Sequence, residues 1–195
     1  ESPFIKNKFI TFGSFNNFSK INDDVINVWS QILKSLPNSR LILKSNLKKD
    51  YSRIKNIFKE NKIEENILFY EKAYPVENHL KLYKNIDIAL DTFPYNGVTT
   101  SFEAIWMGVP VLTMKGYNFN SRCGESINKN LKLDYLIAKN VKEYISKAVE
   151  LAENTDKLVE IRDHIFSNAI ESPLFDQLAF SKNFFSSIEN IYNNI

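Results

Sequence analysis

The chain has 195 residues, and its 25 Lys and Arg residues nearly balance 23 Asp and Glu residues, which gives a net charge of +2. This balance argues against a basic nucleic-acid-binding tail and against an acidic scaffold. A hydrophobic content of 44%, with 15 Phe and 9 Tyr, predicts a folded core and excludes wholesale disorder. The single cysteine, Cys123, excludes an intrachain disulfide and favours a reducing compartment.

Strands and helices alternate over the first part of the chain. Apolar runs predict strands at residues 9–15, 40–44, 66–70, 86–91 and 109–114, and helical spacing predicts helices at residues 22–36, 50–61, 78–85 and 99–107. Beyond Met114 only helical patterns follow, at residues 121–130, 141–152, 155–168 and 177–195. The last of these carries an aromatic and aliphatic stripe that ordinarily indicates core packing.

Most of the predicted strands are continuously apolar, which is typical of a parallel sheet covered on both faces. The fold class is therefore α/β, a single domain with additional C-terminal helices. No stretch approaches the ~20 apolar residues of a membrane span, and the N-terminus lacks the apolar run of a signal peptide. We expect a cytoplasmic protein without a membrane span, and because the chain begins with Glu1, a piece of a longer protein.

Two loops at the predicted carboxyl ends of strands are candidates for ligand binding, because open parallel sheets bind ligands there. The first, residues 13–20, combines Gly13, side-chain donors and Lys20, but lacks the spacing of a P-loop or a dinucleotide fingerprint. It could hold a phosphate. On this loop alone, an Asn- and Ser-rich turn with a solvated lysine is the favoured interpretation.

The second candidate is the segment 91–104, in which Thr99, Thr100 and Ser101 open a helix after a Pro/Asn/Gly turn. Free amides at a helix N-terminus and the helix dipole form an anion site suited to a diphosphate, and Glu103 could accept hydrogen bonds from a ribose. The alternative is a capping box between Thr100 and Glu103, which needs no ligand. The two readings are evenly balanced and compatible.

Neither histidine belongs to a metal-ligand pattern. His79 follows the third predicted strand, whereas His164 lies on a late helix and is expected to be a surface residue. Serine-hydrolase and thiol-protease signatures are missing from the sequence. We therefore expect no metal and no cofactor.

Seven motifs in one order resemble a known family, the C-terminal catalytic lobe of the O-GlcNAc transferase-like glycosyltransferases. They are FGSFNNFSKIND at 12–23, the stretch from Trp29 to LPNSRL at 36–41, LDTFPYNGVTT at 90–100, WMGVPVLT at 106–113, SR at 121–122, LIAKN at 136–140 and SPLFD at 172–176. The resemblance runs from about Phe9 to the end of the chain.

This resemblance implies a GT-B enzyme, in which two Rossmann-like lobes hold a sugar nucleotide between them. Residues 1–195 would be one Rossmann-like UDP-sugar-binding lobe, and residues 177–195 would pack toward a missing N-terminal lobe. Lys20 matches the family lysine that contacts the diphosphate and stabilises the leaving UDP, a role that replaces a metal ion. Asn17 stands where the family usually has a glutamine that reaches the phosphates, and His79 matches a histidine near the nucleotide.

The resemblance also assigns donor-binding roles to the motif at residues 96–100. Asn96 and Gly97 belong to it, Thr99 and Thr100 match threonines that bind the diphosphate, and Glu103 stands where animal members have an aspartate facing the ribose. Two departures concern the donor: Val98 replaces a histidine of animal members, and Leu82 occupies a place where a family arginine can sit. The donor sugar therefore stays open at this point.

The implied reaction is metal-independent, inverting transfer of a hexose, expected to be N-acetylglucosamine, from a UDP-sugar to a Ser or Thr hydroxyl of a protein. The alternatives are a transferase that uses UDP-glucose, another nucleotide sugar or another acceptor, and a non-catalytic nucleotide-binding or interaction module. The expected partners are the N-terminal lobe and tetratricopeptide repeats of a parent chain, and no nucleic acid. An isolated lobe is expected to be inactive in transfer.

Overall fold

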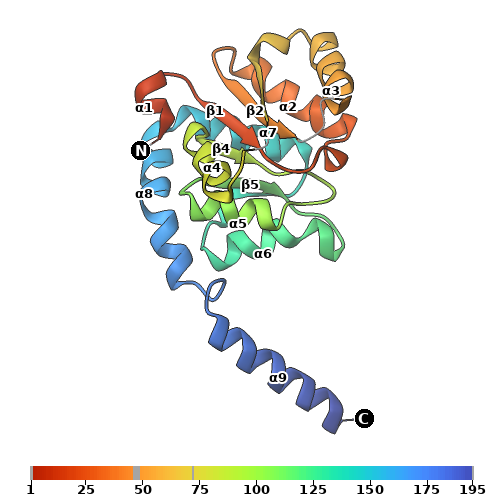
Figure 1. Cartoon of the computed structure of the whole chain (residues 1–195), viewed down its shortest axis with the longest axis vertical. Helices are drawn as coiled ribbons and strands as arrows, with labels where there is room; N and C mark the ends of the chain where they lie inside the picture. The colour runs from red at the N-terminus through yellow and green to blue at the C-terminus, as the bar shows by residue number, and fades with distance from the viewer. Residues whose placement is uncertain (1, 46–48, 72, 195) are drawn as a thin grey trace.

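The computed structural model describes residues 2–45, 49–71 and 73–194, which form a six-stranded sheet in the order β3-β2-β1-β4-β5-β6 (Figure 1). Every neighbouring pair of strands is parallel. The strands are β1 (Thr11–Ser14), β2 (Arg40–Ser45), β3 (Ile67–Glu71), β4 (Ile88–Leu90), β5 (Val111–Met114) and β6 (Ile137–Ala138). The predicted α/β class and parallel sheet are confirmed.

Helices cover both faces of this sheet. They are α1 (Pro3–Asn7), α2 (Asp23–Ser35), α3 (Lys49–Glu60), α4 (Val76–Lys81), α5 (Thr99–Trp106), α6 (Cys123–Asn130), α7 (Val141–Glu153), α8 (Thr155–Glu171) and α9 (Gln177–Asn193). In Figure 1, α5 and α6 lie in front of the sheet, while α7 lies behind it and packs against α2, which in turn contacts α3. Short 3-10 helices, η1 (Phe18–Lys20), η2 (Glu64–Asn66), η3 (Leu82–Asn85), η4 (Phe119–Ser121) and η5 (Asp134–Leu136), complete the connections.

The core lies between the sheet and these two helical layers. Strand side chains such as Phe12, Leu41 and Leu112 are fully buried, as is Trp29 of α2. Helix α2 begins as predicted, because the Asn22 side chain caps it by accepting a hydrogen bond from the Val25 amide at 2.9 Å. The resulting rigid sheet fixes where each strand ends and therefore where the loops meet.

Three elements differ from the sequence-based expectation. The chain beyond Met114 is not purely helical, because Ile137 and Ala138 of β6 pair with Thr113 and Met114 of β5. Helix α1 was not expected, and the helix predicted at residues 78–85 begins at Val76 and continues as η3 from residue 82. Elements of two to six residues are too short to show a hydrophobic period, which explains these errors.

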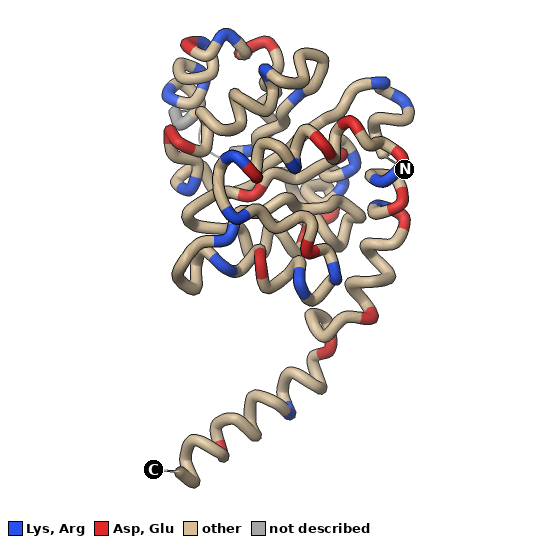
Figure 2. Tube along the Cα trace, turned by 180° about the vertical axis from the view of Figure 1, so that it is seen from behind, with Lys and Arg blue, Asp and Glu red and all other residues tan. Residues whose placement is uncertain are grey.

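Helix α9 projects away from the rest of the molecule (Figure 1), and none of its residues is buried. Phe180 is 66% exposed and Phe185 64%, so the expectation that this stripe packs in the core is wrong within the chain. Figure 2 shows α9 as mostly uncharged, with only isolated charged residues along it. Across the described residues, no helix has both the length and the apolar character that crossing a bilayer requires.

Candidate functional site

The candidate site lies where the direction of the sheet's connections reverses. Strand β1 stands between β2 and β4, so the chain leaves β1 toward one edge and later leaves β4 toward the other. Ligands of open α/β sheets bind beyond the carboxyl ends of the strands at such a switch point. The loop after β1, which ends in η1, and the turn after β4, which ends in α5, are the two segments that meet there.

Asp91 organises the turn that follows β4. Its Oδ1 accepts hydrogen bonds from the amides of Thr92 at 2.9 Å and Gly97 at 2.6 Å, and its Oδ2 accepts one from Thr113 Oγ1 at 2.8 Å. Its backbone carbonyl accepts the Tyr144 hydroxyl at 2.9 Å. The carboxylate therefore fixes both ends of the turn. Sequence reasoning missed this role, for which an aspartate at the end of an apolar strand is the available signal.

Burial raises the pKa of the Asp91 carboxyl to about 6 from an ordinary value of 3.8, and its hydrogen bonds and the nearby Lys20 charge offset only part of that effect. Between these pH values the folded state keeps a proton that the unfolded chain has released. The free energy of unfolding should therefore fall as the pH rises through this window, by about 3 kcal/mol, and stay level above it.

Asp91→Asn isolates this contribution. The asparagine oxygen can accept the same two amides, and its Nδ2 can donate to Thr113 Oγ1, so the variant keeps the network and removes the charge. Urea unfolding at pH 4.5 and at pH 7 should show a smaller loss of stability in Asp91→Asn than in the wild type. Equal pH dependence in the two proteins would contradict the assignment.

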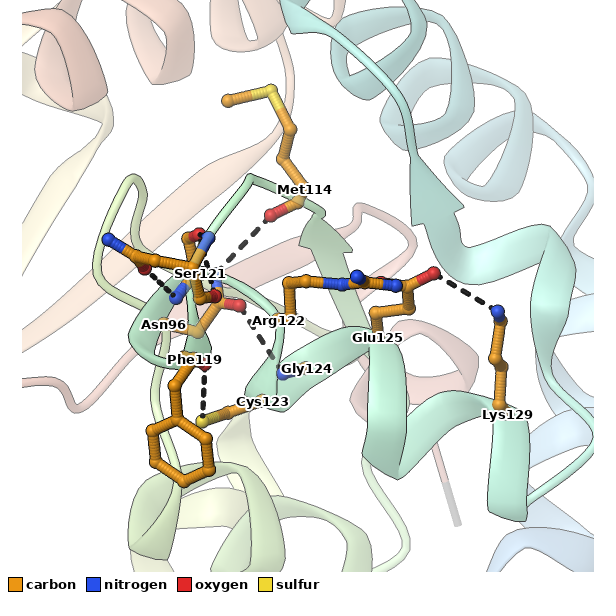
Figure 3. Close-up of polar contacts among 10 residues, drawn as sticks. Asn96, Met114, Phe119, Ser121, Arg122, Cys123, Gly124, Glu125 and Lys129 are labelled. Carbon is orange, nitrogen blue, oxygen red and sulfur yellow. Dashed lines mark hydrogen bonds and ion pairs between the residues drawn. The ribbon is translucent and has the colours of Figure 1, made fainter.

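Asn96 ties the turn to β5 and α6 (Figure 3). Its fully buried side chain donates from Nδ2 to the carbonyls of Thr92 at 2.9 Å and Met114 at 3.4 Å, and its Oδ1 accepts the Gly124 amide at 3.3 Å. All of its side-chain polar atoms are thus used inside the protein. The part of Asn96 that faces the neighbouring loop is its backbone carbonyl.

Lys20 reaches that carbonyl from the loop after β1. Its Nζ donates to Asn96 O at 2.9 Å and lies 4.0 Å from the centre of the Tyr95 ring. Asn17 caps η1, because its Oδ1 accepts the Ser19 amide at 3.0 Å, and this cap sets the direction in which Lys20 leaves the loop. The alternative of a solvated lysine is wrong, since the ammonium is held at the start of the turn before α5.

Helix α5 begins at Thr99 without a side-chain cap on its N-cap residue, Val98. The amides of Ser101 and Phe102 both donate to Val98 O, at 3.1 Å and 3.0 Å, whereas the amides of Thr99 and Thr100 have no acceptor among the described residues. Two free donors and the positive end of the helix dipole therefore face the site. These are the groups expected of an anion site.

The predicted capping box between Thr100 and Glu103 is wrong. Thr100 lies inside the helix, and its Oγ1 donates to Asn16 Oδ1 at 2.9 Å. The Glu103 carboxylate bonds to other elements: its Oε2 accepts the Tyr83 hydroxyl at 3.0 Å and lies 2.9 Å from His79 Nε2. The two side chains thus point to separate partners and leave the backbone amides uncapped.

His79 and Glu103 lie together in a partly buried cluster. Their side chains are 12% and 23% exposed. The cluster also contains Lys44, whose Nζ is 2.5 Å from His79 Nδ1, and Tyr83, whose ring lies 5.7 Å from the His79 ring. Burial and the Glu103 charge raise the pKa of Tyr83, so its hydroxyl remains a donor. Sequence reasoning missed Lys44 and Tyr83.

The buried Glu125 carboxylate of α6 pairs with two exposed cations rather than with a ligand group (Figure 3). Arg122 Nε lies 2.7 Å from Glu125 Oε2, and Lys129 Nζ lies 3.1 Å from Glu125 Oε1. The hydrogen bond from Arg122 lowers the pKa of the Glu125 carboxyl. Over the described ranges of the chain, no three His, Cys, Asp or Glu side chains gather as metal ligands.

Comparison with known proteins gives one family. A family model described as glycosyl transferase family 41 matches residues 4–184. A probable UDP-N-acetylglucosamine–peptide N-acetylglucosaminyltransferase SPINDLY of Solanum lycopersicum is 36% identical over 198 residues, which cover 100% of this chain and 21% of that protein. The corresponding SEC protein of Arabidopsis thaliana is 29% identical, with 96% and 19% covered. The chain thus spans about a fifth of these curated relatives.

Solved structures agree with this result. A mutant of the Thermobaculum terrenum O-GlcNAc transferase superposes with a TM-score of 0.90 at 31% identity, over 96% of this chain and 37% of that one. The pneumococcal O-GlcNAc transferase GtfA, in complex with UDP and GlcNAc, gives a TM-score of 0.63 at 17% identity, over 93% of this chain and 37% of that one. The second likeness shows the fold alone.

Proposed function

The chain belongs to glycosyl transferase family 41, and we propose that it forms the UDP-sugar-binding lobe of an enzyme that transfers N-acetylglucosamine from UDP-GlcNAc to Ser or Thr of proteins. The names of its relatives support this activity. The observation that carries the proposal is the meeting of the Lys20 ammonium with the uncapped N-terminus of α5 at the switch point. A cation and two free amides there suit a diphosphate.

In the proposed reaction the acceptor hydroxyl oxygen attacks the anomeric carbon on the face opposite the UDP group, the bond from that carbon to the UDP oxygen breaks, and the hydroxyl proton is released to solvent, so the configuration inverts. Negative charge develops on the diphosphate as the bond to the sugar breaks. Lys20 and the amides of Thr99 and Thr100 would stabilise that charge without a metal ion. Asn17 and Gly97 would lie along the phosphates, and Glu103 with His79 would hold the nucleoside.

The chain covers 37% of the matching T. terrenum structure, and we propose that it is one lobe of a two-lobed enzyme. The exposed apolar side chains of α9 would then pack against the N-terminal lobe, since an uncovered stripe of this kind is usually an interaction surface. Tetratricopeptide repeats of the parent protein would present the acceptor. Transfer requires the second lobe, because part of the acceptor cleft lies there.

One observation favours a different donor sugar. Val98, the N-cap residue of α5, is 40% exposed and offers no polar side chain where animal members have a histidine. The second candidate is therefore a donor sugar that is recognised without a polar side-chain contact at position 98. Competition of UDP-glucose and other nucleotide sugars with UDP-GlcNAc would distinguish the two.

The diphosphate part of the proposal is tested by titrating this chain with UDP and with uridine in a calorimeter. We expect UDP to bind at least tenfold more tightly, because uridine lacks the groups that Lys20 and α5 would hold. Thr100→Val should weaken UDP binding about tenfold by loosening the contact with Asn16, without changing uridine binding.

Thr155→Val is the matched control, because Thr155 also lies in the first turn of a helix, α8, away from the site. It should leave both affinities unchanged. Failure of UDP to bind at millimolar concentration would contradict the proposal.

A further inference from the structure

Two successive residues of the turn after β4 contact the Lys20 ammonium in different ways. Lys20 Nζ donates a hydrogen bond to the backbone carbonyl of Asn96 at 2.9 Å, and it lies 4.0 Å from the centre of the Tyr95 ring. The first contact uses a backbone atom that every residue has. The second requires an aromatic side chain, because the electron-rich face of the ring attracts the cation.

The backbone of this turn is held from two sides. Thr92 Oγ1 donates to the carbonyl of Tyr95 at 2.7 Å, and the amide of Asn96 donates to the carbonyl of Asn120 at 2.9 Å. The Asn96 side chain is itself fully buried. The Tyr95 ring and the Asn96 carbonyl therefore project from a fixed backbone, and both converge on one ammonium that comes from the loop after β1.

The second contact restrains a side chain that is otherwise flexible. Lysine carries its charge on a four-carbon stem and loses much rotamer entropy when it is held in one place. A single hydrogen bond to Asn96 O would let the stem pivot, whereas the Tyr95 ring also limits the ammonium on a second side. Over the part of the chain that the structure describes, the Lys20 side chain makes no other hydrogen bond and no ion pair. An ammonium has three N–H donors, so two remain for a ligand.

The ring of Tyr95, and not its hydroxyl, makes this contact. Tyr95 is 47% exposed, and its hydroxyl has no hydrogen-bond partner among the described residues. Phenylalanine would therefore keep the contact with Lys20, and leucine would remove it. Because Tyr95 lies at the surface, neither change opens a cavity in the core.

We propose that Tyr95 is a positioning residue that holds the Lys20 ammonium against its ring face, so that the two remaining N–H donors of Lys20 are presented to the diphosphate at the start of α5. This inference rests on the proposed function for the identity of the ligand, but not for the pairing of Tyr95 with Lys20. Tyr95 acts through Lys20 and not on the ligand. Its substitution should therefore affect binding only while Lys20 is present.

The pairing itself is tested without a ligand, by the NMR signals of the ε-methylene protons of Lys20. Protons that lie over the face of an aromatic ring are shifted to lower frequency by its ring current. We expect this shift in the wild type and in Tyr95→Phe, and its loss in Tyr95→Leu, with Lys20→Ala to assign the signals. Equal signals in the wild type and in Tyr95→Leu would overturn the inference.

The consequence for binding is tested by calorimetric titration with UDP and with uridine. Tyr95→Leu should lower the affinity for UDP about fivefold, as expected for a partly exposed cation–π contact, and leave uridine binding unchanged. Tyr95→Phe should stay within about twofold of the wild type, because the ring is kept. In a Lys20→Ala background, Tyr95→Leu should have no further effect, because the cation that the ring holds is gone.

Tyr135→Leu is the matched control. Lys157 Nζ lies 4.4 Å from the centre of the Tyr135 ring, so this variant removes a pair of the same kind. Tyr135 precedes β6 and therefore lies at the amino ends of the parallel strands, away from the site. The variant should change neither the affinity for UDP nor the signals of Lys20.

The outcomes separate this inference from the proposed function. If Tyr95→Phe binds UDP as weakly as Tyr95→Leu, or if Tyr95→Leu weakens binding further in the Lys20→Ala background, Tyr95 contacts the ligand directly and the inference is wrong. An unchanged affinity for UDP in Tyr95→Leu would also overturn it. If the wild type does not bind UDP, the proposed function fails, and the ring-current shift alone decides whether Tyr95 holds Lys20.

Discussion

Lys20→Ala should lower the affinity of the chain for UDP by about a hundredfold and leave uridine binding unchanged. Lys20 is the cation held at the uncapped start of α5, 2.9 Å from Asn96 O, so its removal deletes a charge-assisted contact to the diphosphate. In an enzyme that contains both lobes, the same change should lower kcat by a factor of about 10² to 10³, because the charge on the leaving group is then uncompensated.

Calorimetric titration measures the first effect and single-turnover transfer the second. Lys115→Ala is the control, since Lys115 is an exposed lysine that follows β5 at the same edge of the sheet. If UDP were attracted only by the general positive charge of this edge, Lys20→Ala and Lys115→Ala would lower the affinity for UDP equally. That result would contradict the assignment of Lys20 to the site.

Gly124→Ala should lower the free energy of unfolding by about 3 kcal/mol. A Cβ on Gly124 would lie 2.1 Å from Thr113 Oγ1, 2.7 Å from Thr113 Cβ and 2.8 Å from Asp91 Oδ2. Thr113 and Asp91 are both buried, so neither can yield without breaking their mutual hydrogen bond. Overpacking costs about 1–3 kcal/mol, and a disturbed buried hydrogen bond adds about 1–3 kcal/mol.

Chemical denaturation at pH 7 measures the loss, which corresponds to about 10 °C in Tm for a chain of this size. Ser126→Ala on the exposed side of the same helix is the control and should change stability by less than about 0.5 kcal/mol. On helix propensity alone Gly124→Ala would stabilise α6 by up to about 1 kcal/mol. A stabilising result would therefore mean that the close approach to β5 is absent in solution.

Much of the fold was predictable because its elements are long or strongly apolar. The helix from Asp23 has a capping asparagine and a clear period of 3.6, and the strands beginning at Arg40 and Val111 are continuous apolar runs. The position of the candidate ligand-binding loops, at the carboxyl ends of the strands, then followed from the rule for parallel sheets. Lys20 and Glu103 were placed in the site by motif, and the structure brings both to the edge at which β1 and β4 end.

The rest depended on contacts between segments far apart in the chain. Lys44 and His79 are 35 residues apart, and only the packing of α4 beside β2 makes them neighbours. Asp91 meets Thr113 for the same reason, through the pairing of β4 with β5. The spacing of Thr100 and Glu103 fits a capping box, but both side chains bond to other elements instead. Thr100 donates to Asn16, and Glu103 accepts from Tyr83.

The exposed position of α9 has a thermodynamic consequence. A helix of 17 residues with no buried side chain relies on its own backbone hydrogen bonds, and such a helix is only marginally stable in water. In the proposed two-lobed enzyme its order would therefore be coupled to association, like that of a segment that folds on binding. The entropy lost when α9 becomes ordered opposes the binding of any surface that covers it, so shortening or stiffening this segment would change how tightly the lobe associates without altering the nucleotide site.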